Sequence, residues 1–92
     1  EADLMLAPVI RTREDVAMRF DATAEDVEVV SIVEREWPDS CLDVSYIGQE
    51  DEACAQVITP GYLIILQLAE TVYQYHTDEA GDNVRFAGVD PG

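Results

Sequence analysis

The stretch YLIILQLAETVYQYHT, residues 62–77, contains two segments of strand length separated by two residues. Tyr62–Leu68 is apolar on both faces, which is typical of a strand that lies inside a sheet. Thr71–Thr77 follows as a second strand. Ala69 and Glu70 form the connection, although neither is the Gly or Asn that two-residue turns favour. The stretch therefore predicts an antiparallel hairpin at the centre of the fold.

A two-residue turn fixes which residues of the hairpin face one another. One face carries the three tyrosines Tyr62, Tyr73 and Tyr75, and we expect it to pack on a helix. The predicted cross-strand pairs are Leu68 with Thr71, Leu66 with Tyr73, Ile64 with Tyr75, Leu63 with His76, and Ile65 with Gln74.

The segment before the hairpin predicts a helix and then a strand. Thr12 followed by acids is a helix-start signal, and the apolar residues after it recur at helical spacing, so we expect an amphipathic helix over residues 13–20. Residues 1–10, interrupted by Pro8, are expected to form an edge strand or a docked arm. Residues 23–26 predict one further helical turn.

From Val27 the apolar pattern changes to a period of two. Val27, Val29 and Val33 are expected to point one way, and Val30 and Ile32 the other. The strand is expected to end at residues 37–39, because Pro38 cannot donate to a sheet ladder.

Further elements complete the predicted sheet. Residues 55–58 predict a short strand, and the Pro60–Gly61 pair predicts a turn. Residues 78–83 predict a turn before a last strand at residues 84–86. The predicted fold is α+β: a short helix packed in two layers on three to five antiparallel strands. Ninety-two residues predict one domain, with residues 11–86 as its core and residues 87–92 as a tail.

The net charge of the chain indicates which classes of partner it can bind. Twenty acids stand against five arginines, and the formal net charge is −15. Nucleic acid and anionic membrane surfaces attract clustered Lys and Arg, so neither is expected as a partner. The longest apolar run is of strand length, so no membrane insertion is expected. The acid excess has three explanations: hydration in high salt, a basic partner, or mimicry of a polyanion.

Cys41 and Cys54 are the only cysteines, and three roles remain open for them. They are a disulfide, two metal ligands, or two free thiols. A zinc site needs further soft ligands at tight spacing, and the chain offers only His76. We therefore favour a disulfide, which would contribute about 3 kcal/mol to a small domain and would indicate an oxidising compartment.

No arrangement of residues predicts catalysis. Trp37–Pro38–Asp39 matches the letters of the general-acid loop of protein tyrosine phosphatases, but neither cysteine is followed by the Arg of a Cys-x5-Arg loop. The acidic runs lack the spacing of an EF-hand loop. We therefore expect no enzyme, no metal and no cofactor. The stripe of Tyr62, Tyr73 and Tyr75 has two interpretations, sheet packing or a ligand surface.

Three motifs together resemble a group of small bacterial proteins. They are EWPDSCL at residues 36–42, CAQVITPGY at residues 54–62 and YQYHTD at residues 73–78. The group has a pattern like WPDxCL, CAQVxTPGY and YxYHTD, and its members are mostly uncharacterised, and exported or lipid-anchored. The resemblance covers residues 11–86 and implies export without implying an activity. The segment between the cysteines is longer and more acidic here than in that group. The closing hairpin is also similar to PepSY domains, which are envelope-associated and linked to peptidase regulation.

These patterns lead to an expected function. We expect an extracellular or cell-envelope monomer that binds a protein through the loop between the cysteines, in the manner of a peptidase inhibitor. A loop closed by a disulfide has little freedom left to lose on binding. The alternatives are an acidic surface domain adapted to salt or cations, and a polyanion mimic. The expected contact residues of the loop are Leu42, Val44, Tyr46 and Ile47.

Overall fold

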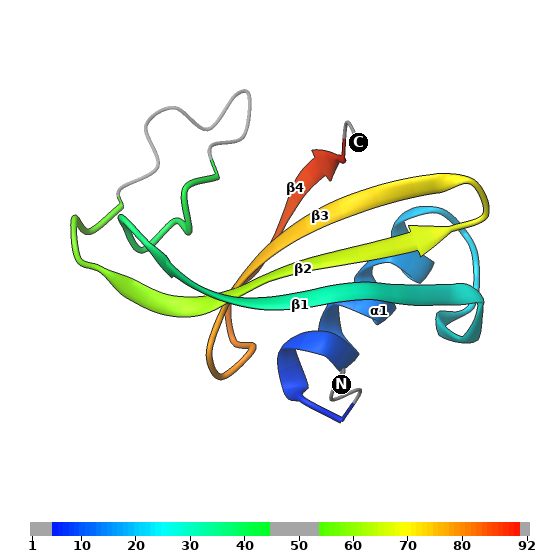
Figure 1. Ribbon diagram of the computed structural model, residues 1–92, viewed down its shortest axis with the longest axis horizontal. Helices are drawn as coiled ribbons and strands as arrows, with labels where there is room; N and C mark the ends of the chain where they lie inside the picture. Colours follow the sequence, from blue (N-terminus) through cyan, green and yellow to red (C-terminus); the bar gives the residue numbers. More distant parts are fainter. Residues whose placement is uncertain (1–4, 45–53, 91–92) are drawn as a thin grey trace.

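The computed structural model describes residues 5–44 and 54–90 (Figure 1). The described chain begins with α1 (Ala7–Arg19) and the 3-10 helix η1 (Ala24–Asp26), followed by four strands. They are β1 (Val27–Trp37), β2 (Thr59–Leu68), β3 (Thr71–Asp78) and β4 (Val84–Val89). The strands form one antiparallel sheet in the order β1-β2-β3-β4. The fold is α+β, with one helix packed on an open four-stranded sheet.

The central hairpin has the register that its sequence predicts. Leu68 pairs with Thr71, Leu66 with Tyr73 and Ile64 with Tyr75. Leu63 lies opposite His76 and Ile65 opposite Gln74, on the other face. The predicted register is therefore confirmed, because a two-residue connection leaves only one alignment of the strands.

One face of the sheet packs on α1 and forms the core. The helix contributes Val9, Val16 and Ala17, and the hairpin contributes Ile64, Leu66, Tyr73 and Tyr75; Val27 of β1 completes the cluster. Leu6, Ala24 and Phe86 are among the partly buried residues around it. The predicted packing of the hairpin on a helix is confirmed.

The helix begins earlier than predicted. It starts at Ala7, with Pro8 in its first turn, so residues 7–10 are not part of an edge strand or arm. Proline is favoured at the first helical positions, where its missing N–H would have no intrahelical partner. Thr12 does not cap the helix. It lies inside α1, fully buried, and its hydroxyl donates to the carbonyl of Val9.

A β-bulge in β1 changes the predicted alternation. The register shifts between Val29 and Ser31. Ile32 therefore lies opposite Ile64 on the core face, and Val33 lies opposite Leu63 on the other face. The prediction that Val33 shares a face with Val27 is wrong, because the extra residue moves every later side chain to the opposite face.

The segment before the hairpin also differs from its prediction. Residues 55–58 are not a strand, and Pro60 and Gly61 lie inside β2 instead of in a turn. Pro60 is opposite Glu36 of β1, and pairing with β3 starts only at Gly61. At Pro60, β2 therefore has a neighbouring strand on one side only, and proline is tolerated at such an edge position. A Cβ at Gly61 would lie 1.8 Å from the carbonyl oxygen of Thr77, so this close approach of β3 requires glycine.

The last strand continues further than predicted. β4 reaches Val89, so residues 87–89 of the expected tail belong to the sheet. A register shift between Gln74 and Tyr75 and a positive φ of 107° at Gly88 mark an irregular edge. Within residues 5–44 and 54–90, no helix is long and apolar enough to span a bilayer.

Candidate functional site

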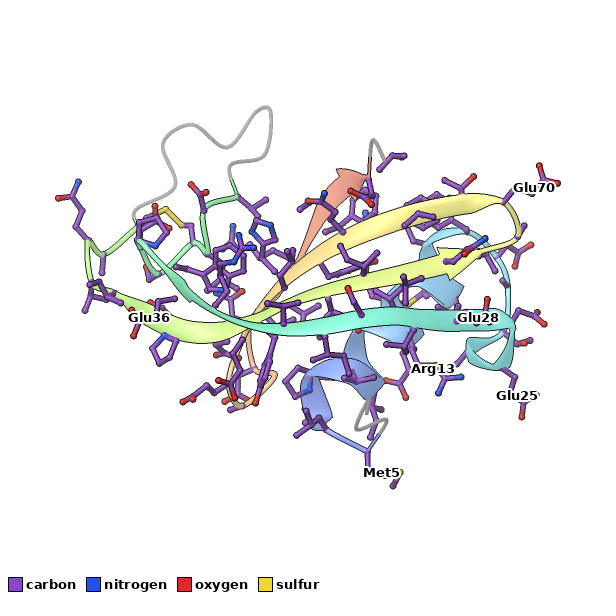
Figure 2. All side chains as sticks on the ribbon, viewed as in Figure 1. Met5, Arg13, Glu25, Glu28, Glu36 and Glu70 are labelled. Atoms are coloured by element: carbon purple, nitrogen blue, oxygen red, sulfur yellow. A yellow bond between two sulfur atoms is a disulfide. The ribbon has the colours of Figure 1, made fainter. Side chains whose placement is uncertain are left out.

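Cys41 and Cys54 form a disulfide, with their Cα atoms 5.5 Å apart. The prediction of a disulfide is confirmed, and the metal-ligand and free-thiol roles are excluded for this pair. Figure 2 shows the bond toward the end of the sheet away from the β2–β3 turn. We call the surrounding described residues the loop base; it comprises residues 39–44, Cys54 and Ala55, with Trp37, His76 and Asn83, which hold them.

Asp39 organises the turn that carries Cys41. One carboxylate oxygen of Asp39 accepts from the backbone N–H of Cys41 at 3.0 Å and from that of Asp43 at 3.1 Å. The Asp39 carbonyl accepts from the N–H of Leu42. Leu42 and Asp43 both have φ of 60°, in the left-handed region. Asp side chains commonly fold the backbone in this way, since they mimic a backbone acceptor.

Ser40 joins the two ends of the loop. Its N–H donates to the carbonyl of Ala55 at 2.9 Å, and its hydroxyl oxygen accepts from the N–H of Ala55 at 2.8 Å. The Ser40 carbonyl also accepts from the side-chain amide of Asn83 at 3.0 Å. The chain on either side of the cysteines is therefore tied both to itself and to the β3–β4 turn.

Trp37 and His76 support the turn from the sheet. The two rings stack, with centroids 3.9 Å apart and planes 13° apart. The indole N–H of Trp37 donates to the carbonyl of Thr77 at 3.0 Å. His76 Nδ1 lies 2.6 Å from the carbonyl oxygen of Leu42. Because a carbonyl only accepts, Nδ1 carries the hydrogen, and in the neutral ring Nε2 carries the lone pair.

Burial lowers the pKa of His76 below its ordinary value of 6.5. Arg35 acts in the same direction, whereas the hydrogen bond to Leu42 and the nearby Asp43 act against it. The guanidinium of Arg35 lies 5.7 Å from the centre of the Trp37 ring. The imidazole is therefore held neutral as a structural donor at neutral pH.

The predicted contact residues of the loop separate into two groups. Leu42 is fully buried and Val44 is 8% exposed, so neither side chain can reach a partner in this structure. Burial of both side chains disfavours them as contact residues, and their role in binding stays a prediction. Tyr46 and Ile47 lie outside the described residues.

The tyrosine stripe lies at the interface between the sheet and the helix. Tyr75 is fully buried and Tyr73 nearly so, while Tyr62 is half-buried. The Tyr75 hydroxyl donates to the carboxylate of Asp15, which also pairs with Arg19 at 3.1 Å. Burial raises the pKa of Tyr75, and the bond to Asp15 raises it further. These contacts support the packing interpretation over the ligand surface.

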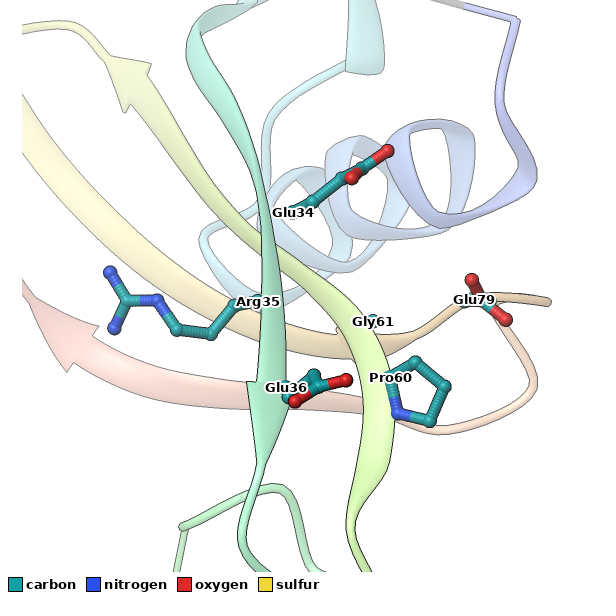
Figure 3. A pocket seen from close by; sticks show the side chains of 6 residues that line it. All are labelled: Glu34, Arg35, Glu36, Pro60, Gly61 and Glu79. Atoms are coloured by element: carbon teal, nitrogen blue, oxygen red, sulfur yellow. The ribbon is translucent and has the colours of Figure 1, made fainter.

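An acidic hollow lies beside the same end of the sheet. Its volume is about 340 Å³, and three glutamates line it together with Arg35, Pro60 and Gly61; the glutamates are Glu34, Glu36 and Glu79. Figure 3 shows that the Arg35 side chain extends to the other side of β1, away from Glu34 and Glu79. Within the described residues, no three His, Cys, Asp or Glu side chains are grouped to hold a metal ion.

Only some of the contacts that build the loop base could have been predicted from the sequence. Asp39 and Ser40 after Pro38 are typical turn residues, and that signal could have predicted the tight turn. His76 and Leu42 are 34 positions apart in the chain, so no local sequence pattern predicts the contact between them.

Residues 9–86 match the family described as Domain of unknown function (DUF8738). The chain belongs to this family. The DUF8738 match includes the loop base and both cysteines, so the site lies within the part that defines the family. An uncharacterised family is consistent with the resemblance found in the sequence, and the detailed motif pattern stays a prediction. Neither the curated proteins nor the solved structures include a match to the chain.

Proposed function

We propose that this domain is an exported, non-catalytic binding module that presents the segment between Cys41 and Cys54 to a protein partner. The observation that supports it is the double attachment of that segment. The disulfide, the Ser40–Ala55 bonds and the His76–Leu42 bond fix both of its ends to the sheet. Fixed ends reduce the conformational entropy that a binding segment loses when it docks.

The disulfide also supports the proposed location. Disulfides persist in oxidising compartments and are rare where thiols are kept reduced. The formed Cys41–Cys54 bond is therefore compatible with an extracellular or cell-envelope protein. The resemblance to exported bacterial proteins points in the same direction.

The chemistry of the site supports binding over catalysis. Both cysteines are oxidised, so neither offers a thiolate nucleophile. The one histidine of the chain is stacked on Trp37 and bonded to the carbonyl of Leu42. A Cys–His pair would need both groups free for proton transfer.

The more specific form of the proposal is peptidase inhibition. A peptidase cleft takes an extended segment held in a fixed conformation, and an apolar side chain commonly anchors it. With Leu42 and Val44 buried, this role passes to Tyr46 and Ile47. It is supported by the fixed ends of the segment and by the similarity of the closing hairpin to PepSY domains.

The experiment compares three proteins on a panel of secreted serine, cysteine and metallo-peptidases and in a pull-down from secreted proteins. They are the wild type, a Tyr46→Ala/Ile47→Ala variant, and an Ile58→Ala control, whose side chain is 66% exposed outside the loop base. We expect inhibition or capture of one partner by the wild type and the control, with loss in the double variant. Equal behaviour of all three proteins would exclude the loop as the contact surface.

A second candidate is a structural domain whose acids hydrate the surface in high salt. It is favoured by the excess of acids, because the chain carries 20 acids and only five arginines to pair with them. This candidate expects stability to rise with salt, and a melting temperature that is flat in salt and calcium would remove it. The polyanion mimic needs one continuous acidic face. The labelled acids Glu36 and Glu70 lie toward opposite ends of the molecule (Figure 2), so such a face would have to run along its length.

A further inference from the structure

The turn that carries Cys41 contains two consecutive left-handed residues, Leu42 and Asp43. Neither is glycine, and β-carbons make this conformation unfavourable. The turn therefore needs ties to the surrounding structure to persist. The ties are the two bonds to the Asp39 carboxylate, the burial of Leu42, and the bond from His76 to the Leu42 carbonyl.

The tie from His76 is the one that reaches the turn from the sheet. Its imidazole is stacked on Trp37, with the ring centroids 3.9 Å apart, and its Nδ1 lies 2.6 Å from the carbonyl oxygen of Leu42. Histidine is also the side chain whose charge ordinarily changes between pH 5 and 8. A change of charge at His76 therefore acts directly on the strained residue.

The groups around His76 come from each element packed against it. Arg35 of β1 opposes a positive charge on the ring, and Asp43 of the turn favours it. Leu63, opposite His76 on β2, is apolar, and Arg85, opposite it on β4, is bonded to Asn83. Burial and Arg35 thus outweigh the Leu42 hydrogen bond and the Asp43 carboxylate, and the pKa of His76 is lowered.

We propose that His76 is a pH-sensitive latch that holds the Leu42–Asp43 turn against the sheet when neutral and releases it when protonated. Protonation transfers a proton from hydronium to the lone pair of Nε2, which leaves a water molecule and every covalent bond of the protein intact. The imidazolium is better solvated outside the stack with Trp37, so the ring leaves it and the Leu42 carbonyl loses its donor. The disulfide keeps Cys41 tethered, and the turn relaxes around it. The latch requires no partner, so it goes beyond the binding role and stands or falls separately from it.

The direction of the pH dependence follows from the lowered pKa of the latched histidine. In the released form the ring is in water and takes its ordinary pKa of 6.5. The released form therefore binds more protons as the pH falls below 6.5, and the latched form loses its advantage from there down through its own lower pKa. Above pH 6.5 the latch is fully closed.

The experiment uses the single tryptophan as the reporter. Trp37 emission and the NMR chemical shifts of the His76 ring are recorded from pH 8 to pH 4 on the oxidised protein. We expect one transition with a midpoint below 6.5 in both signals, with a red shift of the emission as the indole gains water. Amide exchange at Leu42 and Val44 should accelerate over the same pH range.

Two exposed side chains provide opposite controls. Arg35→Gln removes the neighbouring cation and should move the midpoint up, while Asp43→Asn removes the anion and should move it down. His76→Asn places an amide nitrogen near the position of Nδ1 without a titrating ring, so its Trp37 emission should show no such transition. Circular dichroism at pH 7.5 establishes that each variant is folded.

Several outcomes would overturn the latch. One is an emission that stays flat although the NMR shifts show His76 titrating, since the ring then remains in the stack. Another is a transition that persists in His76→Asn, because carboxylates would then be its cause. Midpoints that move together in Arg35→Gln and Asp43→Asn would also reject it. Loss of peptidase inhibition or of capture bears only on the binding role.

Discussion

At the scale of single residues, Leu42 shows how a side chain inside a loop becomes part of a core. It is fully buried although it stands between Cys41 and the acidic segment that follows. Asp39 bends the backbone so that Leu42 turns inward, and His76 bonds its carbonyl. An apolar residue in a polar loop is therefore not by itself an exposed anchor.

The burial of Leu42 predicts a large effect of truncation. Leu42→Ala should lower the free energy of unfolding by about 2–5 kcal/mol, because it removes buried methyl groups and leaves a cavity. Alanine is the right replacement, since glycine would also relieve the left-handed φ of 60°. Urea unfolding measures the change, with Ile58→Ala as the exposed control, which should stay within about 0.5 kcal/mol of the wild type. A similar small change for Leu42→Ala would mean that the turn collapses without a cavity.

At the scale of elements, the β2–β3 hairpin combines a strong strand pattern with an unfavourable turn. Ala69 has φ of 56°, a left-handed conformation that two-residue turns usually give to glycine. The side-chain amide of Gln67 donates to the Ala69 carbonyl at 3.0 Å and helps to fix it. The hairpin forms in spite of Ala69, because Ile64, Leu66, Tyr73 and Tyr75 bury its inner face.

The turn therefore offers a stabilising substitution. Ala69→Gly should raise the free energy of unfolding by up to about 1 kcal/mol, because relief of the left-handed strain outweighs the added flexibility of the unfolded chain. Ala80→Gly, in the exposed β3–β4 turn and without a positive φ, supplies the matched control. It should cost about 0.4–1 kcal/mol, since only the unfolded chain changes. Denaturant midpoints compare the two. Destabilisation of both variants by the same amount would show that Ala69 carries no strain.

At the scale of the whole molecule, charge opposes folding. The net charge is −15 on 92 residues, because 20 acids stand against five arginines. Carboxylates on α1, η1, β1 and the turns repel one another in the folded state more than in the expanded chain. Salt reduces this repulsion, because the screening length falls from about 10 Å at 0.1 M to about 3 Å at 1 M.

Stability should therefore rise with salt. We expect the melting temperature to increase by several degrees between 0.1 and 1 M sodium chloride, since each 1 kcal/mol raises it by about 4–8 °C in a domain of this size. A Glu25→Gln/Glu28→Gln/Glu70→Gln variant removes charge from exposed sites and should reproduce part of the gain at low salt. Calorimetry of both proteins over the salt series measures it. An unchanged melting temperature of the variant at low salt would mean that repulsion is not the cause.

The parts of the fold that were predictable are those with local causes. The hairpin register follows from the two residues at its turn, and the end of β1 follows from Pro38. Two wrong predictions concerned prolines, because the effect of a proline on secondary structure depends on its surroundings. Pro8 opens α1 instead of breaking a segment, and Pro60 fits inside β2 because β3 does not reach that position. The bulge at Val29–Ser31 depends on the fit of β1 to β2 and left no sign in the alternation.

The sequence by itself determined the α+β class, the register of the central hairpin, the acidic surface and the pairing of Cys41 with Cys54. The class and the register follow from apolar periodicity and turn length, which are local features of the sequence. The charge and the cysteine pairing follow from composition, which is a property of the whole chain. Only the tertiary structure decided that Leu42 turns inward, that His76 holds it, and which face of β1 meets α1. Those outcomes depend on contacts between residues far apart in the chain, and no local pattern specifies the partner of a buried carbonyl or the place of a bulge.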